Sequence, residues 1–120
     1  GDLVTSAFGT TGCSSSTRGI FAQGTVSPFA GTNTIQFVTI STTGNTSDFG
    51  DLNFKGYRGA SCSSNIRGVI VQGSEDSGGA RNAIDFITIA TTGNATDFGD
   101  KTEATGEMSE SGTSNAHGGL

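Results

Sequence analysis

The sequence predicts an all-β protein built from a tandem repeat. The phrase "STTGNTSDFGD" at Ser41–Asp51 returns almost unchanged as "ATTGNATDFGD" at Ala90–Asp100. The chain of 120 residues holds 20 Gly, one Pro, no Trp and little Leu, so good helix formers are scarce. Ile, Val, Phe and Thr dominate its apolar stretches, and Gly, Asn, Ser and Asp separate them, as in short strands joined by turns. This length suits one small domain.

The repeat has a period of 49 residues. When Cys13–Asp51 is aligned with Cys62–Asp100 without a gap, 20 of 39 positions are identical. Most other core positions exchange one apolar residue for another, so we expect both copies to fold alike. We therefore divide the chain into unit 1 (residues 1–49), unit 2 (residues 50–98) and a partial third repeat, cap or tail (residues 99–120), which together form one domain.

Each unit is predicted to consist of short strands. "RGIFAQG" at Arg18–Gly24 is an apolar run bounded by glycines and too short for a helix. "NTIQFVTIS" at Asn33–Ser41 has apolar residues on both faces, which is typical of a strand covered on both sides. "TTGN" then supplies the Gly and Asn of a hairpin turn, and "TSDFGDL" at Thr46–Leu52 returns with Phe49 as its anchor.

A last piece at Phe54–Ser64 has small residues and leads into the next copy. Four strands in about 49 residues is the pattern of one blade of a β-propeller. The third copy is degenerate: when one inserted residue is allowed so that "NAHGG" aligns with "NIRGV", the position of Cys62 falls on Gly112. Such an end is typical of a terminal cap, although its Glu and Ser content also fits a frayed tail.

The pattern "SSxxRGVxxxG…NxIxFxTIATTGNATDFGD" resembles the Kelch-type β-propeller repeat. More narrowly, it is similar to repeats of structural and tail-associated proteins of marine and cyanobacterial bacteriophages. The resemblance implies a structural module of a virion or tail, located in the virion or outside the cell. Two departures are "QG" in place of the family's paired "GG" and the missing Trp of many Kelch blades.

Two blades and a fraction do not close a propeller, which needs ~4 to 8. Isolated blades would leave apolar faces and strand edges in water. We therefore expect a homo-oligomer, with a trimer favoured because three chains of two blades close a six-bladed ring, or else further repeats in a longer chain. The alternative is a two-unit, pseudo-symmetric β-sandwich within one chain.

The sequence predicts no enzyme, no catalytic residue, no metal and no cofactor. "DFG" lacks the phosphate loop, strand lysine and catalytic loop of a kinase. The recurring aspartates, such as Asp48 and Asp51, do not have the spacing of an EF-hand and fit turn capping better. His117, the one histidine, lies in the degenerate tail, where Gly-rich surroundings do not hold it beside a nucleophile.

The net charge of −5 and only six scattered basic residues argue against a nucleic-acid partner. No apolar run has the length of a membrane-spanning helix, so we expect no membrane insertion. Cys13 and Cys62 occupy equivalent positions of the two units, and we expect buried free thiols there rather than a disulfide.

One polar set is presented once per unit: Arg18 and Gln23, repeated as Arg67 and Gln72. Repeated identical sites suit a multivalent, lectin-like carbohydrate binder, because linked weak sites raise avidity. The alternative is that these side chains satisfy buried backbone groups between units. We therefore expect a non-enzymatic, repeat-built structural module, with a glycan-binding module as the alternative. The loops "TVSPFAGT" and "SEDSGGAR" differ between the units, which places sequence tolerance on one rim.

Overall fold

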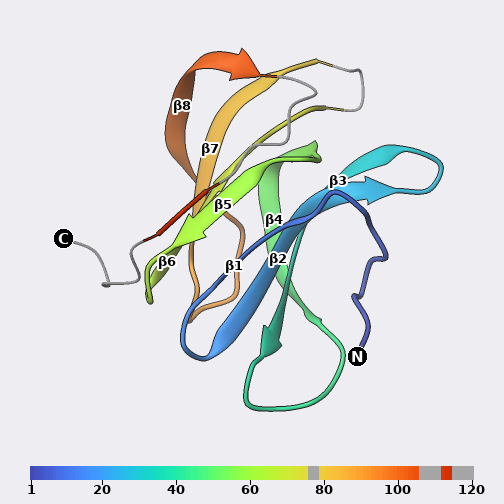
Figure 1. Ribbon diagram of the computed structural model, residues 1–120, viewed down its shortest axis with the longest axis vertical. Coiled ribbons are helices and arrows are strands. Elements are labelled where there is room, and N and C mark those ends of the chain that lie inside the picture. The colour runs from blue at the N-terminus through green and yellow to red at the C-terminus, as the bar shows by residue number, and fades with distance from the viewer. Residues whose placement is uncertain (76–78, 106–111, 115–120) are drawn as a thin grey trace.

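The protein consists of two four-stranded antiparallel sheets, as Figure 1 shows. The structure, a computed structural model, describes residues 1–75, 79–105 and 112–114. Its strands are β1 (Thr11–Ser14), β2 (Arg18–Val26), β3 (Ala30–Thr39), β4 (Ser47–Gly56), β5 (Ala60–Ser63), β6 (Arg67–Val71), β7 (Arg81–Thr88) and β8 (Thr96–Thr105). Each sheet is a meander, with β1 to β4 in sheet 1 and β5 to β8 in sheet 2, in chain order. The described residues form no helix, so they include no helix that could cross a membrane. The predicted all-β class is confirmed.

The strand pairing repeats with the same period as the sequence. Ile20 faces Phe37 across β2 and β3, and Val69 faces Phe86 across β6 and β7. In the next pair of strands, the partner of Gly50 in sheet 1 is Ile35, and Gly99 has the matching place in sheet 2. Similar sequences therefore form sheets of the same register.

The sheets begin at a different point of the repeat than the predicted units. The return strand and the piece after it form one strand, β4, which continues to Gly56. Only the "ASCS" part of Phe54–Ser64 forms a further strand, and this strand, β5, belongs to sheet 2. Each sheet thus crosses a boundary of the units drawn from the sequence. A tandem repeat fixes its period but not its starting point, and only hydrogen bonding between strands decides where a sheet begins.

A β-bulge sets the position of Phe49. Across β3 and β4, Ile35 pairs with Gly50 while Gln36 pairs with Asp48, so Phe49 has no partner in the ladder. Gly50 has a φ of 144°, a conformation that side chains rarely allow, and its equivalent Gly99 has 141°. Such a bulge redirects a side chain out of the regular alternation of a strand. Glycine in "DFGD" is therefore required by the backbone.

The apolar core joins the two sheets. Its buried members from sheet 1 and sheet 2 are Ile20, Ala22, Ile35, Phe49, Leu52, Ile70, Ile87, Ile89 and Ala95. The first strands of the sheets, β1 and β5, lie side by side (Figure 1). The hydroxyls of Thr11 and Ser61 are hydrogen-bonded there at 2.8 Å, and the Ser63 hydroxyl donates to the Ser14 carbonyl at 2.7 Å. Hydroxyl pairs and an apolar core thus hold the sheets together.

Equivalent residues differ in burial according to whether a sheet covers them. Phe49 lies between the sheets and is 3% exposed, whereas its equivalent Phe98 on β8 is 55% exposed. Ile89 is 1% exposed, whereas its equivalent Ile40 is 55% exposed. The prediction that the strand at Asn33–Ser41 is covered on both sides is therefore wrong at Ile40. Each sheet has one face covered by the other sheet. The opposite face of sheet 1 is partly covered by residues 1–5, which bury Gln36 and leave Ile40 exposed.

Candidate functional site

The candidate site is the junction where the end of sheet 1 docks on the hairpin between β7 and β8. The Gly93 amide donates to the Phe49 carbonyl at 2.7 Å, and the Ala95 amide donates to the Asp51 carbonyl at 2.8 Å. The Asp51 amide in turn donates to Asn94 Oδ1 at 3.1 Å. All three bonds involve the backbone of Phe49–Asp51. The hairpin "TTGN" is therefore a receptor for the backbone of an extended segment.

The same junction occurs a second time, at the start of the chain. The Asp2 amide donates to Asn45 Oδ1 at 2.9 Å, and the Thr46 amide donates to the Asp2 carbonyl at 2.9 Å. Residues 1–5 thus lie on the hairpin of sheet 1 as residues 50–54 lie on the hairpin of sheet 2. This explains the repetition of "GDL" and "TTGN" in the sequence, because one motif docks on the other.

The junction leaves no room for a side chain at its glycine. A Cβ atom on Gly50 would lie 2.5 Å from the Gly93 carbonyl carbon and 2.9 Å from the Asn94 nitrogen. Both atoms belong to the backbone, so neither can move without shifting the hairpin. The equivalent Gly99 on β8 has no atom within 4 Å of such a Cβ. Close approach therefore requires glycine at Gly50, whereas only the bulge requires it at Gly99.

A buried carboxylate completes the junction at sheet 2. Asp85 is 1% exposed and accepts hydrogen bonds from the Asn53 amide at 3.2 Å, from Asn53 Nδ2 at 2.6 Å and from Gln72 Nε2 at 2.8 Å. Hydrogen bonds to a charged group contribute about 1.5–3 kcal/mol each, which offsets the cost of burying the charge. Sequence reasoning missed Asp85, because its partner Asn53 lies 32 residues away in a different sheet.

The equivalent of Asp85 in sheet 1 is Gln36, which makes a different set of contacts. Gln36 Oε1 accepts from the Val4 amide at 2.7 Å and from the Thr46 hydroxyl at 2.8 Å. The two junctions therefore share their backbone contacts and differ in the side chain that receives the fourth residue of the docked segment.

The two predicted arginines each lie over an aromatic ring. The Arg18 guanidinium lies 4.6 Å from the centre of the Phe37 ring, and that of Arg67 lies 4.4 Å from the centre of the Phe86 ring. Such cation–π contacts contribute about 0.5–1 kcal/mol at exposed sites. Arg18 also donates to the Ile89 carbonyl at 2.8 Å and so joins the sheets. It is half-buried, and Arg67 is exposed.

The two predicted glutamines are buried. Gln23 Nε2 is 3.4 Å from the Val71 carbonyl of sheet 2, and Gln72 Nε2 donates to Asp85. The Oε1 atoms of both side chains have no hydrogen-bond partner in the part of the chain that the structure describes. The contact between Gln23 and the Val71 carbonyl fits the alternative interpretation, in which these side chains satisfy buried backbone groups between the units. Ligand binding by Arg18, Gln23, Arg67 and Gln72 stays a prediction.

A small hollow, not foreseen from the sequence, lies beside each hairpin. It has a volume of about 120 Å³ in sheet 1 and about 150 Å³ in sheet 2. Its shared lining is Phe37, Thr39, Thr42, Thr43 and Asn45 in sheet 1, repeated as Phe86, Thr88, Thr91, Thr92 and Asn94 in sheet 2. Arg18 and Arg67 lie over the two phenylalanines but are not among the residues that line these hollows. The repeated "TTGN" was the signal, but it was interpreted only as a turn.

Cys13 and Cys62 are free thiols. They lie on β1 and β5, the neighbouring first strands of the two sheets. Burial and, to a smaller extent, the nearby Cys62 raise the pKa of the Cys13 thiol to about 11, against the opposite effect of a hydrogen bond with Ser63. A thiol with such a pKa is almost entirely protonated at neutral pH and is a poor nucleophile.

Within residues 1–75, 79–105 and 112–114, no group of three His, Cys, Asp or Glu side chains could hold a metal ion. Asp97 Oδ1 accepts from the Gly99 amide at 3.1 Å, which is turn capping of the predicted kind. His117 and most of the third copy lie outside the described residues. Of the described residues there, Gly112 lies against Ser61 and Cys62 of β5.

No model of a known protein family matches this chain, and no curated protein is similar to it at a significant level. The resemblance to Kelch-type repeats of phage proteins therefore stays a prediction from the repeat motif.

We expect Gly50→Ala to destabilise the fold by about 3 kcal/mol and Gly99→Ala by only about 1 kcal/mol. Both substitutions strain a backbone of similar positive φ, but only the first pushes a methyl group into the hairpin backbone. Urea unfolding followed by circular dichroism measures both losses. Equal losses would show that the junction tolerates a side chain and that the close approach is not required.

We expect the titration of the Cys13 thiol alone to lower the free energy of unfolding by about 1 kcal/mol between pH 8 and pH 10. The folded thiol has a pKa of about 11 against an ordinary value of 9.0, so the unfolded chain loses its proton first as the pH rises. This contribution is complete below pH 9 and is lost as the pH approaches 11. Denaturant unfolding at both pH values measures the fall, and Cys13→Ser should show a shallower one. An equally steep fall in that variant would contradict the assignment.

Proposed function

We propose that this chain is a non-enzymatic structural module whose two sheets are blades of a propeller and whose open faces bind further copies head to tail. The observation that carries the proposal is the exposure of Phe98, which is 55% exposed although its equivalent Phe49 at the junction is only 3% exposed. A Cβ atom on the neighbouring Gly99 would likewise meet no atom within 4 Å. The resemblance to repeats of phage structural and tail-associated proteins supports the same function and a location in a virion or outside the cell.

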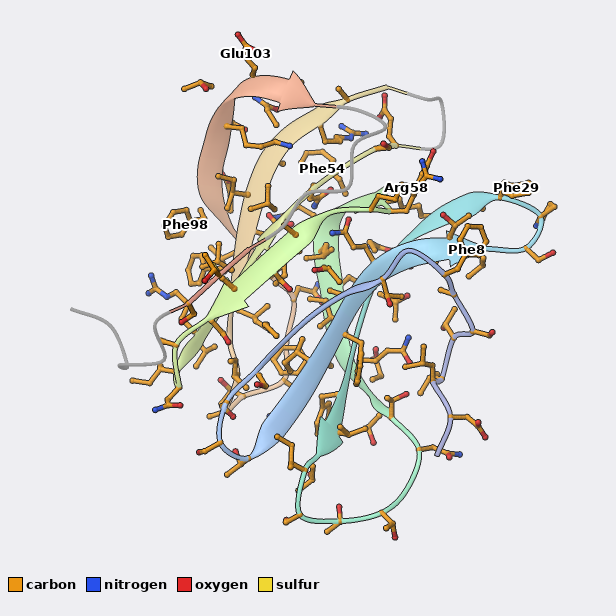
Figure 2. The ribbon with its side chains drawn as sticks, in the orientation of Figure 1. Phe8, Phe29, Phe54, Arg58, Phe98 and Glu103 are labelled. Carbon is orange, nitrogen blue, oxygen red and sulfur yellow. The ribbon has the colours of Figure 1, made fainter. Side chains whose placement is uncertain are left out.

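The two open faces are the two halves of one interface. Phe49 and its neighbours dock on sheet 2, so Phe98 belongs to the docking half, which is uncovered on sheet 2. Ile89 belongs to the receiving half, and its equivalent Ile40 is uncovered on sheet 1. Figure 2 shows Phe98 beside β8, away from sheet 1. An exposed large apolar residue on each face favours a partner, and the faces differ, so the contact is heterologous.

Repeating this contact by a constant rotation gives a ring. Propellers close with ~4 to 8 blades, and three copies of two blades make six. A trimer is therefore the proposed assembly, and further repeats in a longer chain would supply the same partners. In the alternative, a two-unit sandwich, both outer faces meet water, and Ile40 and Phe98 would have no role there.

We expect size-exclusion chromatography with light scattering to give about three times the chain mass of 12.0 kDa at micromolar concentration. Phe98→Ser should lower this mass while leaving the circular dichroism spectrum unchanged, because Phe98 is largely exposed within the chain. Phe29→Ser is the control, since Phe29 is even more exposed but lies at the tip of the β2–β3 hairpin (Figure 2). A stable monomer for the unaltered chain, or an unchanged mass for Phe98→Ser, would contradict the proposal.

The second candidate function is multivalent binding of carbohydrate. One hollow per sheet has the same phenylalanine, threonine hydroxyls and asparagine amide, and a predicted arginine lies over each phenylalanine ring. A small number of placed polar groups next to an aromatic ring is typical of small-ligand sites. Each hollow is small, so a single site would bind weakly and the assembly would supply avidity.

For this candidate, we expect the unaltered protein to bind multivalent glycans on an array and the double variant Thr43→Val, Thr92→Val to lose most of that binding. The substitution keeps the shape and removes one hydroxyl from each hollow. The single variant Thr43→Val should show an intermediate signal, since half of the sites remain. Absence of binding by the unaltered protein to any multivalent glycan would contradict this function.

A further inference from the structure

We infer that sheet 1 carries a peptide-binding slot for an extended Gly-Asp-Leu segment, which the chain's first five residues fill and from which an added peptide of the same sequence displaces them. The slot consists of Gln36, Asn45 and Thr46, together with the backbone of Gly44. The inference goes beyond the proposed assembly, because the slot is formed within one chain.

The slot binds its occupant through the backbone. Asn45 Oδ1 accepts from the Asp2 amide at 2.9 Å, the Thr46 amide donates to the Asp2 carbonyl at 2.9 Å, and Gln36 Oε1 accepts from the Val4 amide at 2.7 Å. Residues 1–5 form no strand, and the side chain of Val4 is exposed. A segment held mainly by hydrogen bonds of this kind opens at low cost, so it is exchangeable.

The slot selects glycine at the first position and an apolar residue at the third. A Cβ atom on Gly1 would lie 2.5 Å from the Gly44 carbonyl carbon, so alanine does not fit. Leu3 is only half-buried, and a hollow of about 130 Å³ remains between it, Phe21 and Val38. Its equivalent Leu52 is fully buried at the other junction. The slot of sheet 1 therefore has space for an apolar side chain that its present occupant does not fill.

Which side chain the slot accepts at its fourth position depends on the residue of the sheet that receives this position's backbone amide. In sheet 2, Asp85 accepts from both the backbone amide and the side-chain Nδ2 of Asn53. In sheet 1, Gln36 stands in its place and meets Val4, which offers only a backbone amide. The slot of sheet 1 therefore accepts valine, which a buried carboxylate at this position would not favour.

The third copy of the motif is a poorer occupant. Gly99-Asp100-Lys101 has a lysine where Leu3 and Leu52 stand, and the Lys101 ammonium donates to the Gln72 carbonyl of its own sheet at 2.9 Å. Placing an ammonium in an apolar slot is costly. Residues 1–5 also have the advantage of a tethered ligand, with an effective concentration of about millimolar. Residues 1–5 therefore keep this slot, and in the proposed assembly Phe98 of a neighbouring chain would contact the face of Ile40 beside it.

The test uses the full chain with Gly1→Val, which releases residues 1–5 from the slot, and three acetylated peptides. Gly-Asp-Leu-Val-Thr copies residues 1–5, Ala-Asp-Leu-Val-Thr blocks the first position, and Gly-Asp-Lys-Thr-Glu copies residues 99–103. In nitrogen-15 NMR spectra, we expect the first peptide to shift the Thr46 backbone amide and the side-chain amides of Asn45 and Gln36 saturably. The alanine peptide should give no shifts, and the lysine peptide should bind at least about tenfold more weakly.

Absence of shifts with Gly-Asp-Leu-Val-Thr, or equal binding of the alanine or lysine peptide, would overturn the inference. If Gly1→Val does not fold, the same titrations are made on the unaltered chain. Its own segment then competes, so affinities fall while the order of the three peptides must remain. Peptide binding is observed at the slot itself, so it is scored whether the chain is monomeric or trimeric. A monomer that binds the peptide contradicts only the assembly, and a trimer that does not bind it contradicts only the slot.

Discussion

The two sheets depend on one close contact between backbones, where Gly50 lies against the hairpin at Gly93. The contact exists because the bulge gives Gly50 a positive φ and leaves Phe49 outside the ladder. It aligns the carbonyl of Phe49 with the hairpin amide, and this alignment places Phe49 and Leu52 in the core between the sheets. The buried Asn53–Asp85 hydrogen bonds follow from the same approach, because Asn53 comes directly after the docked residues.

Identical residues have different environments in the two copies, because only one copy of each has the other sheet packed against it. Arg18 reaches the carbonyl of Ile89 because a sheet lies next to it, whereas its equivalent Arg67 is exposed. Phe49 and Phe98 differ in the same way. In a repeat protein each unit contacts only its neighbours, so the terminal units expose what the inner junctions bury. In the proposed assembly, the exposed member of each pair marks the surface that a neighbouring unit would cover.

The sequence predicted the parts of this structure that depend on local order. The glycine-bounded run became β2, "TTGN" became a hairpin, and Phe49 became a core residue, since alternation and turn chemistry act over a few residues. The residue at which each sheet begins could not be predicted, because the length of a repeat does not show where its structural unit starts. Asp85 and the hollows beside the hairpins were also missed, since both arise from contacts between distant segments. The sequence identified one repeated polar set, Arg18, Gln23, Arg67 and Gln72, but it did not show which residues surround these side chains.

The difference between Gln36 in sheet 1 and Asp85 in sheet 2 affects how two such similar halves find their correct partners during folding. Neighbouring repeats of nearly equal sequence are prone to pair with the wrong partner during folding. Asn53 offers a side-chain donor that the carboxylate of Asp85 accepts, whereas Val4 offers none to Gln36. Exchanging the two segments would leave a carboxylate oxygen without its donor in a buried place. One pair of unlike residues thus penalises the swapped arrangement and favours a single order of the halves along the chain.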